Sequence, residues 1–165
     1  MHDFRDIDGK LHCEKVSVAK IAKAVGTPFY LYSHHTLASH FAAVDGAFAA
    51  VPHITAYAVK ANANLAILRL FAGLGGGADI VSGGELYRAL KAGVPRDKIV
   101  FAGVGKSREE IGEALRAKIL LFNVESAQEL RAIDEVARKH KTRARISLRV
   151  NPHIDPKTHP YISTG

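Results

Sequence analysis

The chain has 165 residues, of which 47% are hydrophobic and 24% are charged, and its formal net charge is +7. The length suits one domain with a sizeable core, and no apolar run approaches the roughly 20 residues that cross a bilayer. The single cysteine, Cys13, excludes an internal disulfide and fits a reducing compartment. The N-terminus lacks the basic start and apolar middle of a secretory signal, so we expect a cytoplasmic protein.

The basic excess does not indicate a nucleic-acid partner. Lysines and arginines are spread through segments of helical pattern with acids between them, and they form no platform with aromatic residues. A diffuse excess of this kind is also compatible with small anionic ligands. The nine histidines show no spacing that places two of them and a third ligand on one face, so we predict no metal site.

The first fifty residues predict short elements in a mixed order. Asp8-Gly9 between two extended stretches is a hairpin signal, and Gly26 and Pro28 are typical of a helix end. We predict strands over residues 4–7, 10–12 and 29–32, and helices that begin at Ser17 and Ser33 and end before Gly26 and Val51. Residues 1–26 look detached from the rest of the chain.

From residue 54 onward, predicted strands and helices alternate. The strands cover residues 54–60, 78–81, 99–102, 120–124 and 145–150, and the helices cover residues 64–72, 83–92, 108–117 and 127–139. This order implies parallel strands, with each helix crossing back over the sheet. A doubly wound sheet and a (β/α)8 barrel both begin in this way.

Charged residues near three strand ends favour the barrel. Alternation places Lys60, Asp79 and Arg149 on the side opposite the apolar residues that should meet the helices. Helices on both faces would bury these charges at a cost, whereas in a barrel they point inward near the C-terminal mouth, where active sites assemble. We therefore predict an α/β fold, namely the first five strands of a partial (β/α)8 TIM-type barrel, preceded by a short N-terminal segment.

Lys60 is the candidate nucleophile. On the predicted strand it shares a face with the small residues Ala56 and Ala58, which leave room for a flat molecule. A partly desolvated amine is free to attack a carbonyl, which is the setting of a Schiff-base lysine. The alternative is a lysine that marks where a buried strand reaches the surface.

The other candidate residues also have structural alternatives. Asp79 could cap the turn after its strand, and Arg149 could pair with a nearby acid. Glu85 belongs to a Ser-x-x-Glu capping pattern that recurs at residues 107–110 and 126–129, which favours a structural role beside a catalytic one. Taken together, two cations and an anion at strand ends suit a phosphorylated or carboxylated ligand.

Several stretches resemble a known family. They are TPFYLYSHHTL (27–37), YAVKAN (57–62), GGGADIVSGGELYRALKAGV (75–94), ISLRVNP (146–152) and THPYISTG (158–165). In this order they resemble the diaminopimelate decarboxylases, within the alanine-racemase-like group of decarboxylases that use pyridoxal 5′-phosphate. The opening, with HCE before SVAKIAKAVGTPFYLY, resembles these enzymes more than the ornithine or arginine decarboxylases.

The resemblance implies a site and a reaction. Lys60 would hold pyridoxal phosphate, Asp79 and Arg149 would lie in the cofactor site, and Ala58 and Glu85 would lie close behind. The implied reaction is decarboxylation of meso-2,6-diaminopimelate to L-lysine in lysine biosynthesis, by a homodimer. Three alternatives stay open: a decarboxylase of another basic amino acid (ornithine, arginine or carboxynorspermidine), a non-catalytic pyridoxal phosphate-binding barrel, and a plain α/β interaction domain.

The family pattern also implies parts that would lie beyond residue 165. These are a glycine-rich phosphate loop, a histidine that stacks on the ring, a glutamate at the ring nitrogen and a C-terminal β domain. We therefore expect an incomplete N-terminal portion of the enzyme, inactive by itself. Residues 1–26 would join the missing β domain, and residues 27–165 would form the N-terminal part of the pyridoxal phosphate-binding barrel.

Overall fold

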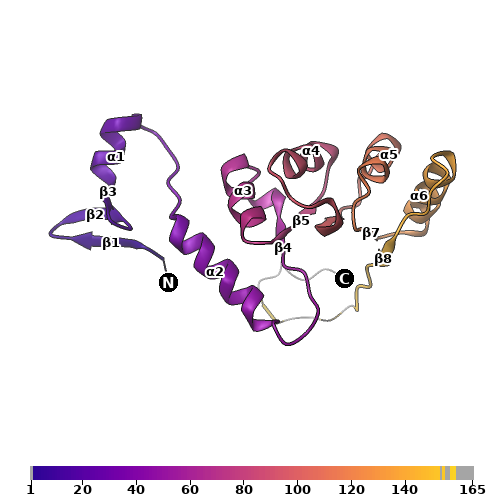
Figure 1. Cartoon of the computed structure of the whole chain (residues 1–165), viewed down its shortest axis with the longest axis horizontal. Helices are drawn as coiled ribbons and strands as arrows, with labels where there is room; N and C mark the ends of the chain where they lie inside the picture. Colours follow the sequence, from indigo (N-terminus) through magenta and orange to yellow (C-terminus); the bar gives the residue numbers. More distant parts are fainter. Residues whose placement is uncertain (1, 153, 155–156, 159–165) are drawn as a thin grey trace. The chain divides into compact units, whose positions relative to one another are not determined.

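The computed structural model describes residues 2–152, 154 and 157–158. It divides into two compact units, Met1–Thr55 and Ala56–Gly165. Figure 1 follows the elements of both units along the chain. Among the described residues no helix combines the length and apolar character that a bilayer span requires.

The N-terminal unit contains a small antiparallel sheet and two helices. Its elements are β1 (Phe4–Ile7), β2 (Lys10–Cys13), β3 (Val16–Ser17), α1 (Val18–Val25) and α2 (His34–Ala47), with strand order β1-β2-β3. Asp8 and Gly9 both have positive φ, as expected of a two-residue hairpin turn, and they join the paired residues Ile7 and Lys10. The hairpin and both helices are therefore confirmed, whereas β3 was not predicted.

The predicted strand over residues 29–32 is wrong. The stretch has no regular structure, and the side chain of Tyr30 is 90% exposed. Its aromatic residues have high strand propensity, but a strand also needs a paired neighbour, and in the described part of the unit this stretch has none.

Two carboxylates join the N-terminal hairpin to the start of α2. Asp3 Oδ2 accepts hydrogen bonds from Thr36 Oγ1 (2.7 Å) and His35 Nδ1 (2.8 Å), and Glu14 Oε1 accepts from Ser33 Oγ (2.8 Å) and the His35 amide (3.0 Å). Both carboxylates lie where the helix dipole favours negative charge. The hydrogen bond from His35 holds the pKa of Asp3 at about 2, and the same contact raises the pKa of His35.

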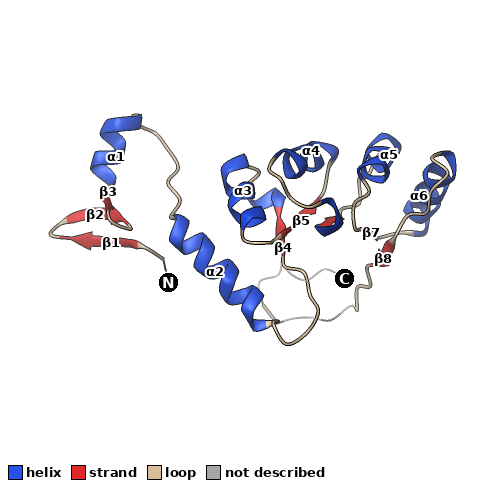
Figure 2. Ribbon diagram, in the orientation of Figure 1, coloured by secondary structure: helices blue, strands red, loops and turns tan. Residues whose placement is uncertain are grey.

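The C-terminal unit is built on a five-stranded parallel sheet. Its strands, in spatial order, are β4 (Ala56–Ala58), β5 (Gly77–Ile80), β6 (Ile99–Phe101), β7 (Leu121–Val124) and β8 (Ile146–Leu148). The main helices are α3 (Leu65–Gly73), α4 (Gly83–Lys91), α5 (Arg108–Ala117) and α6 (Ala127–Lys139), with the 3-10 turns η1 (Val59–Ala61) and η2 (Arg96–Lys98). Figure 2 shows all four α-helices on one side of this sheet.

The core lies between the sheet and these helices. Ile80, Ile99 and Phe101 on the strands are fully buried, as are Ile111 of α5 and Val59 of η1. Burial of each such side chain stabilises the fold by about 1.5–3 kcal/mol relative to leaving it exposed. The strand runs are therefore apolar on the face that meets the helices, as the alternation predicts.

The opposite face of the sheet carries Asp79 between two apolar strand residues. Ala58 pairs in register with Asp79, and Asp79 with Val100, so these three residues lie side by side across β4, β5 and β6. All three are half-buried, and the α-helices of the unit cover the other side. This one-sided cover agrees with the predicted barrel staves and not with a doubly wound sheet.

One expectation about the helix-facing side is wrong at β8. Leu148 and Val150 belong to the apolar face of the predicted strand 145–150, the face that should meet the helices, but they are 64% and 79% exposed. The reason is that β8 is the edge strand of the described sheet, so it has a packed neighbour on only one side.

We expect the Asp3–His35 contact to be strongest between about pH 4 and pH 6.5. An acid with a lowered pKa stabilises the folded state above its unfolded pKa, here 3.8, and loses that contribution as the pH falls through about 2. His35, whose pKa is raised, contributes fully below 6.5 and loses its contribution as the pH rises through its folded pKa.

Hydrogen exchange measures this window. The Glu14 amide donates to the Asp3 carbonyl at 2.8 Å, so its protection factor should be highest inside the window. Asp3→Asn should lower that protection factor and flatten its pH dependence. His53→Ala removes another histidine–aspartate pair and should leave Glu14 protection unchanged. Equal protection in wild type and Asp3→Asn would contradict the assignment.

Candidate functional site

The carboxyl ends of the parallel strands bring the predicted charges together. Asp79 lies on β5, Lys60 follows β4 and Arg149 follows β8. The charges of Lys60, Arg149 and Lys106 all act to lower the pKa of Asp79, so this carboxylate feels three cations from the same end of the sheet. This edge of the sheet is where barrel enzymes assemble their active sites.

Asp79 is the residue that most clearly lacks a partner. Its Oδ1 atom is buried and, within the described residues, accepts no hydrogen bond. Burial raises the pKa of this carboxyl, and the neighbouring cations offset only part of that effect. Because buried polar atoms in folded proteins are nearly always hydrogen-bonded, this oxygen is a candidate ligand contact.

Lys60 is not on a strand, which corrects the sequence prediction. β4 ends at Ala58, and Lys60 lies in η1, where Val59 turns completely into the core. The burial of Val59 outweighs continuation of the strand, and Lys60 is exposed rather than desolvated. Ala58, half-buried beside Asp79, still provides the small neighbour that the alternation predicted.

Arg149 pairs with an acid, which was the structural alternative considered for it. Its Nη1 donates to Glu125 Oε2 at 3.0 Å, and its backbone amide donates to the Val124 carbonyl at 2.9 Å. The guanidinium is more than half exposed, whereas the side chain of Glu125 is only 14% exposed. Arg149 is therefore anchored at the end of β7 and also lies close enough to influence Asp79.

Glu85 has a structural contact of its own. Its Oε2 accepts from the Val81 amide at 2.8 Å, and its amide donates to Ser82 Oγ at 3.2 Å. The glutamate of this capping pattern thus binds the amide one position before the N-cap. Of the capping patterns, the one at residues 107–110 forms the reciprocal box in which each side chain binds the other's backbone.

Glu110 joins two helices as well as capping its own. Its Oε1 accepts from the Gly83 amide at the start of α4 (2.7 Å), and its Oε2 accepts from the Ser107 amide (2.9 Å). A Cβ on Gly83 would come within 3.1 Å of Glu110 Cγ, so glycine permits this close approach. These two backbone contacts lower the pKa of Glu110.

Lys106 is a central residue that the sequence prediction missed. Its side chain is 0% exposed, and its Nζ donates to the Gly103 carbonyl (2.6 Å), to the Asn123 carbonyl (2.9 Å) and to Glu129 Oε1. It therefore joins the loop after β6 to the end of β7. In the sequence it is a lone lysine in a polar loop, a pattern that predicts solvent exposure.

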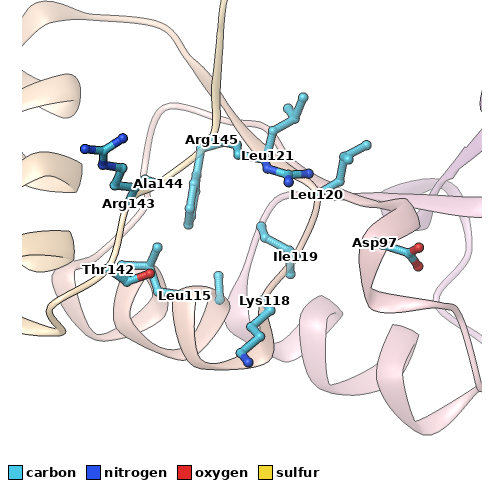
Figure 3. Close-up of a pocket in the computed structure, with 12 residues that line it drawn as sticks. Asp97, Leu115, Lys118, Ile119, Leu120, Leu121, Thr142, Arg143, Ala144 and Arg145 are labelled. Atoms are coloured by element: carbon cyan, nitrogen blue, oxygen red, sulfur yellow. The ribbon is translucent and has the colours of Figure 1, made fainter.

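A separate pocket lies at the other end of the strands. It has a volume of about 320 Å³ and is framed by the segments that lead into β7 and β8, including Ile119, Leu120, Arg143 and Arg145 (Figure 3). None of the predicted site residues lines it. Because barrel chemistry is located at the carboxyl ends of strands, we do not assign the active site to this pocket.

No group of three or more His, Cys, Asp or Glu side chains that could hold a metal ion occurs in the described part of the chain. The polar atoms that the structure brings together are instead those of one carboxylate, two amines and a guanidinium. Such a set is suited to an anionic ligand with a carbonyl group.

The buried Lys106–Glu129 pair allows a direct test of its structural role. Lys106→Met leaves Glu129, 9% exposed, without its cationic partner, so we expect the free energy of unfolding to fall by about 3–5 kcal/mol. Arg108→Met is the control, because its pair with Glu135 is exposed on both sides and should change stability by about 0–1 kcal/mol. Urea denaturation measures both, and equal losses would show that Lys106 has no special role.

Comparison with known proteins adds the chemical class. The family model described as pyridoxal-dependent decarboxylase, pyridoxal binding domain, matches residues 34–165. The chain is 52% identical to the diaminopimelate decarboxylase of Aquifex aeolicus over 158 residues, which are 96% of this chain and 37% of that protein. It is 50% identical to the diaminopimelate decarboxylase of Haemophilus influenzae over 165 residues, which are 100% of this chain and 40% of that protein.

Solved structures agree with these matches. The crystal structure of diaminopimelate decarboxylase from Helicobacter pylori, complexed with L-lysine, superposes with a TM-score of 0.84 at 49% identity, over 87% of this chain and 36% of that one. The enzyme from M. jannaschii gives 0.84 at 41% identity, over 99% and 40%. The partial barrel is thereby confirmed, and the chain spans about two fifths of the length of these relatives.

Proposed function

Because this chain belongs to the pyridoxal-dependent decarboxylases, through their pyridoxal-binding domain, we propose that it supplies part of a pyridoxal phosphate site in which Lys60 is the attachment point. The observation that carries the proposal is Asp79 Oδ1, a buried carboxylate oxygen that accepts no hydrogen bond from the described residues and belongs to a carboxyl on which the charges of three cations act. Lys60 follows β4, and Asp79 lies on the neighbouring strand β5.

The residues present fit this cofactor. Pyridoxal phosphate carries an aldehyde, an anionic phosphate and a flat ring, and the chain offers an amine, cationic side chains and a small residue beside them. Lys60 is exposed, so its amine is accessible to a carbonyl. Ala58 next to Asp79 leaves space that a larger side chain would fill. The unpaired oxygen of Asp79 provides an acceptor for a donor or cation on the ligand.

When bound, pyridoxal phosphate supplies an electron sink for the carbanion that forms as carbon dioxide leaves a substrate. The protein groups bind this cofactor and orient it. Lys60 contributes the amine, Arg149 keeps guanidinium donors beyond the one that binds Glu125, and Asp79 Oδ1 accepts or holds a proton. Burial raises the pKa of Asp79, which favours proton retention there. Glu85, committed to the Val81 amide, supports the start of α4.

For the substrate, we propose meso-2,6-diaminopimelate, decarboxylated to L-lysine by the protein to which this portion belongs. Support comes from relatives named diaminopimelate decarboxylase at about 50% identity, and from the Helicobacter pylori structure that contains L-lysine. We further propose, from the family resemblance, a cytoplasmic homodimer in which residues 1–26 join a C-terminal β domain. The family model begins at residue 34 and does not cover residues 1–26.

Covalent trapping tests the role of Lys60. After incubation with pyridoxal phosphate and reduction with borohydride, peptide mass mapping should place a pyridoxyl group on Lys60, because the adjacent anion-binding groups favour that amine over other exposed lysines. Lys60→Arg should lose the modification, and Lys91→Arg, which removes another exposed lysine, should keep it. Equal labelling of many surface lysines, or unchanged labelling in Lys60→Arg, would contradict the proposal.

We also expect the 165-residue chain by itself to release no lysine from diaminopimelate. It spans 37–40% of its relatives, and a half-covered sheet face exposes the site to water, which weakens electrostatic stabilisation. Amino-acid analysis after incubation with the substrate and the cofactor measures the product. Lysine released above the level of the Lys60→Arg variant would overturn this expectation.

A further inference from the structure

Glu125 makes two contacts that join three strand ends. Its Oε2 accepts from Arg149 Nη1 at 3.0 Å, and its Oε1 accepts from the Gly103 amide at 2.9 Å. Gly103 follows β6, Glu125 follows β7 and Arg149 follows β8. Both oxygens of the carboxylate are thus engaged, and its side chain is largely buried.

The position of Glu125 is itself fixed by the buried pair below it. The Glu125 amide donates to Glu129 Oε2 at 2.8 Å, and Glu129 Oε1 accepts from Lys106. Lys106 also binds the carbonyl of Gly103, the residue whose amide binds Glu125. The backbone of Glu125 and one of its carboxylate partners are therefore held by the same lysine.

Two of the three cations whose charges act on Asp79 are paired with other acids. Of the three cations that influence it, Lys106 is paired with Glu129 and Arg149 with Glu125, while Lys60 forms no ion pair within the described residues. Within the described residues Asp79 Oδ1 accepts no hydrogen bond, although the charge of the Arg149 guanidinium acts on its carboxyl. Glu125 holds that guanidinium through the hydrogen bond of 3.0 Å.

We propose that Glu125 is a positioning residue that keeps Arg149 from closing onto Asp79 and so leaves Asp79 Oδ1 open for a ligand. Without Glu125, the guanidinium would be free to form a charge-assisted hydrogen bond with Asp79, the acceptor nearby that lacks one. The importance of this for the cofactor rests on the proposed function. The competition between Glu125 and Asp79 for Arg149 does not rest on the proposed function, because all three residues belong to this chain.

The test is the pKa of the Asp79 carboxyl, measured by carbon NMR titration of the chain without cofactor. In Glu125→Ala the freed guanidinium should lower this pKa by about one unit, as an opposite charge at short range does. Glu135→Ala is the matched control, since it releases Arg108 from a surface pair and should leave the Asp79 titration unchanged. An unchanged or higher pKa in Glu125→Ala would overturn the proposal.

A second set of variants separates positioning from two simpler effects. Removing a negative charge lowers the Asp79 pKa slightly even without movement, so Glu125→Ala is repeated in an Arg149→Ala background, where the fall should be much smaller. An equal fall in both backgrounds would show that Arg149 is not involved. Glu125→Gln keeps the shape of the side chain if Glu125→Ala fails to fold. It should lower the pKa in the same direction, and no change there would also count against the proposal.

Cofactor binding distinguishes this inference from the function on which its importance rests. If Glu125 positions Arg149 in a pyridoxal phosphate site, Glu125→Ala should weaken pyridoxal phosphate binding by about tenfold, and Glu125→Gln should restore part of it. A lowered Asp79 pKa without cofactor binding by any variant would support the positioning role and count against the cofactor site. Cofactor binding with an unchanged Asp79 pKa would support the cofactor site and count against the positioning role.

Discussion

The arrangement at the carboxyl ends of the strands depends on one buried amine. Lys106 donates to the loop after β6, to the end of β7 and to Glu129 at the start of α6, all without exposure to solvent. A buried cation is stable only with such complete pairing, so the three segments must keep their relative positions while the chain is folded. This framework fixes the position of Glu125, and Glu125 in turn binds Arg149.

The sheet imposes the second constraint. Strands alternate with period two, so apolar residues such as Ile80 and Phe101 meet the helices while Asp79 and Val100 face the other way. With the helices of the unit on one side only, the second face is free to carry polar chemistry. This division explains why charges that would be costly in a doubly wound sheet are tolerated at the strand ends.

The combination of a fixed framework and an unsatisfied oxygen is suited to ligand binding. Lys106 and Glu110 hold loops and helix starts through backbone contacts, whereas Asp79 has a buried oxygen that no described residue hydrogen-bonds. Preorganised groups bind a ligand without the cost of rearrangement. Membership of the pyridoxal-dependent decarboxylase family gives this arrangement a chemical context, since that cofactor needs an amine, a flat space and compensation of its charges.

The sequence by itself determined the order of elements, the capped helices and the faces of the strands. Helices α5 and α6 begin and end where predicted because serine caps and helical periodicity are local signals. It also identified Asp79 and Arg149 as charges at strand ends on one edge of the sheet.

Tertiary structure alone decided where strands stop, because pairing and core burial act between distant segments. Val59 turns into the core, so Lys60 does not lie on the strand, and residues 29–32 have no neighbouring strand in the described part of their unit. Lys106 is buried by contacts to residues 17 and 23 positions away. Periodicity cannot indicate such long-range pairing, which is why the groups that position the site were found only in the folded chain.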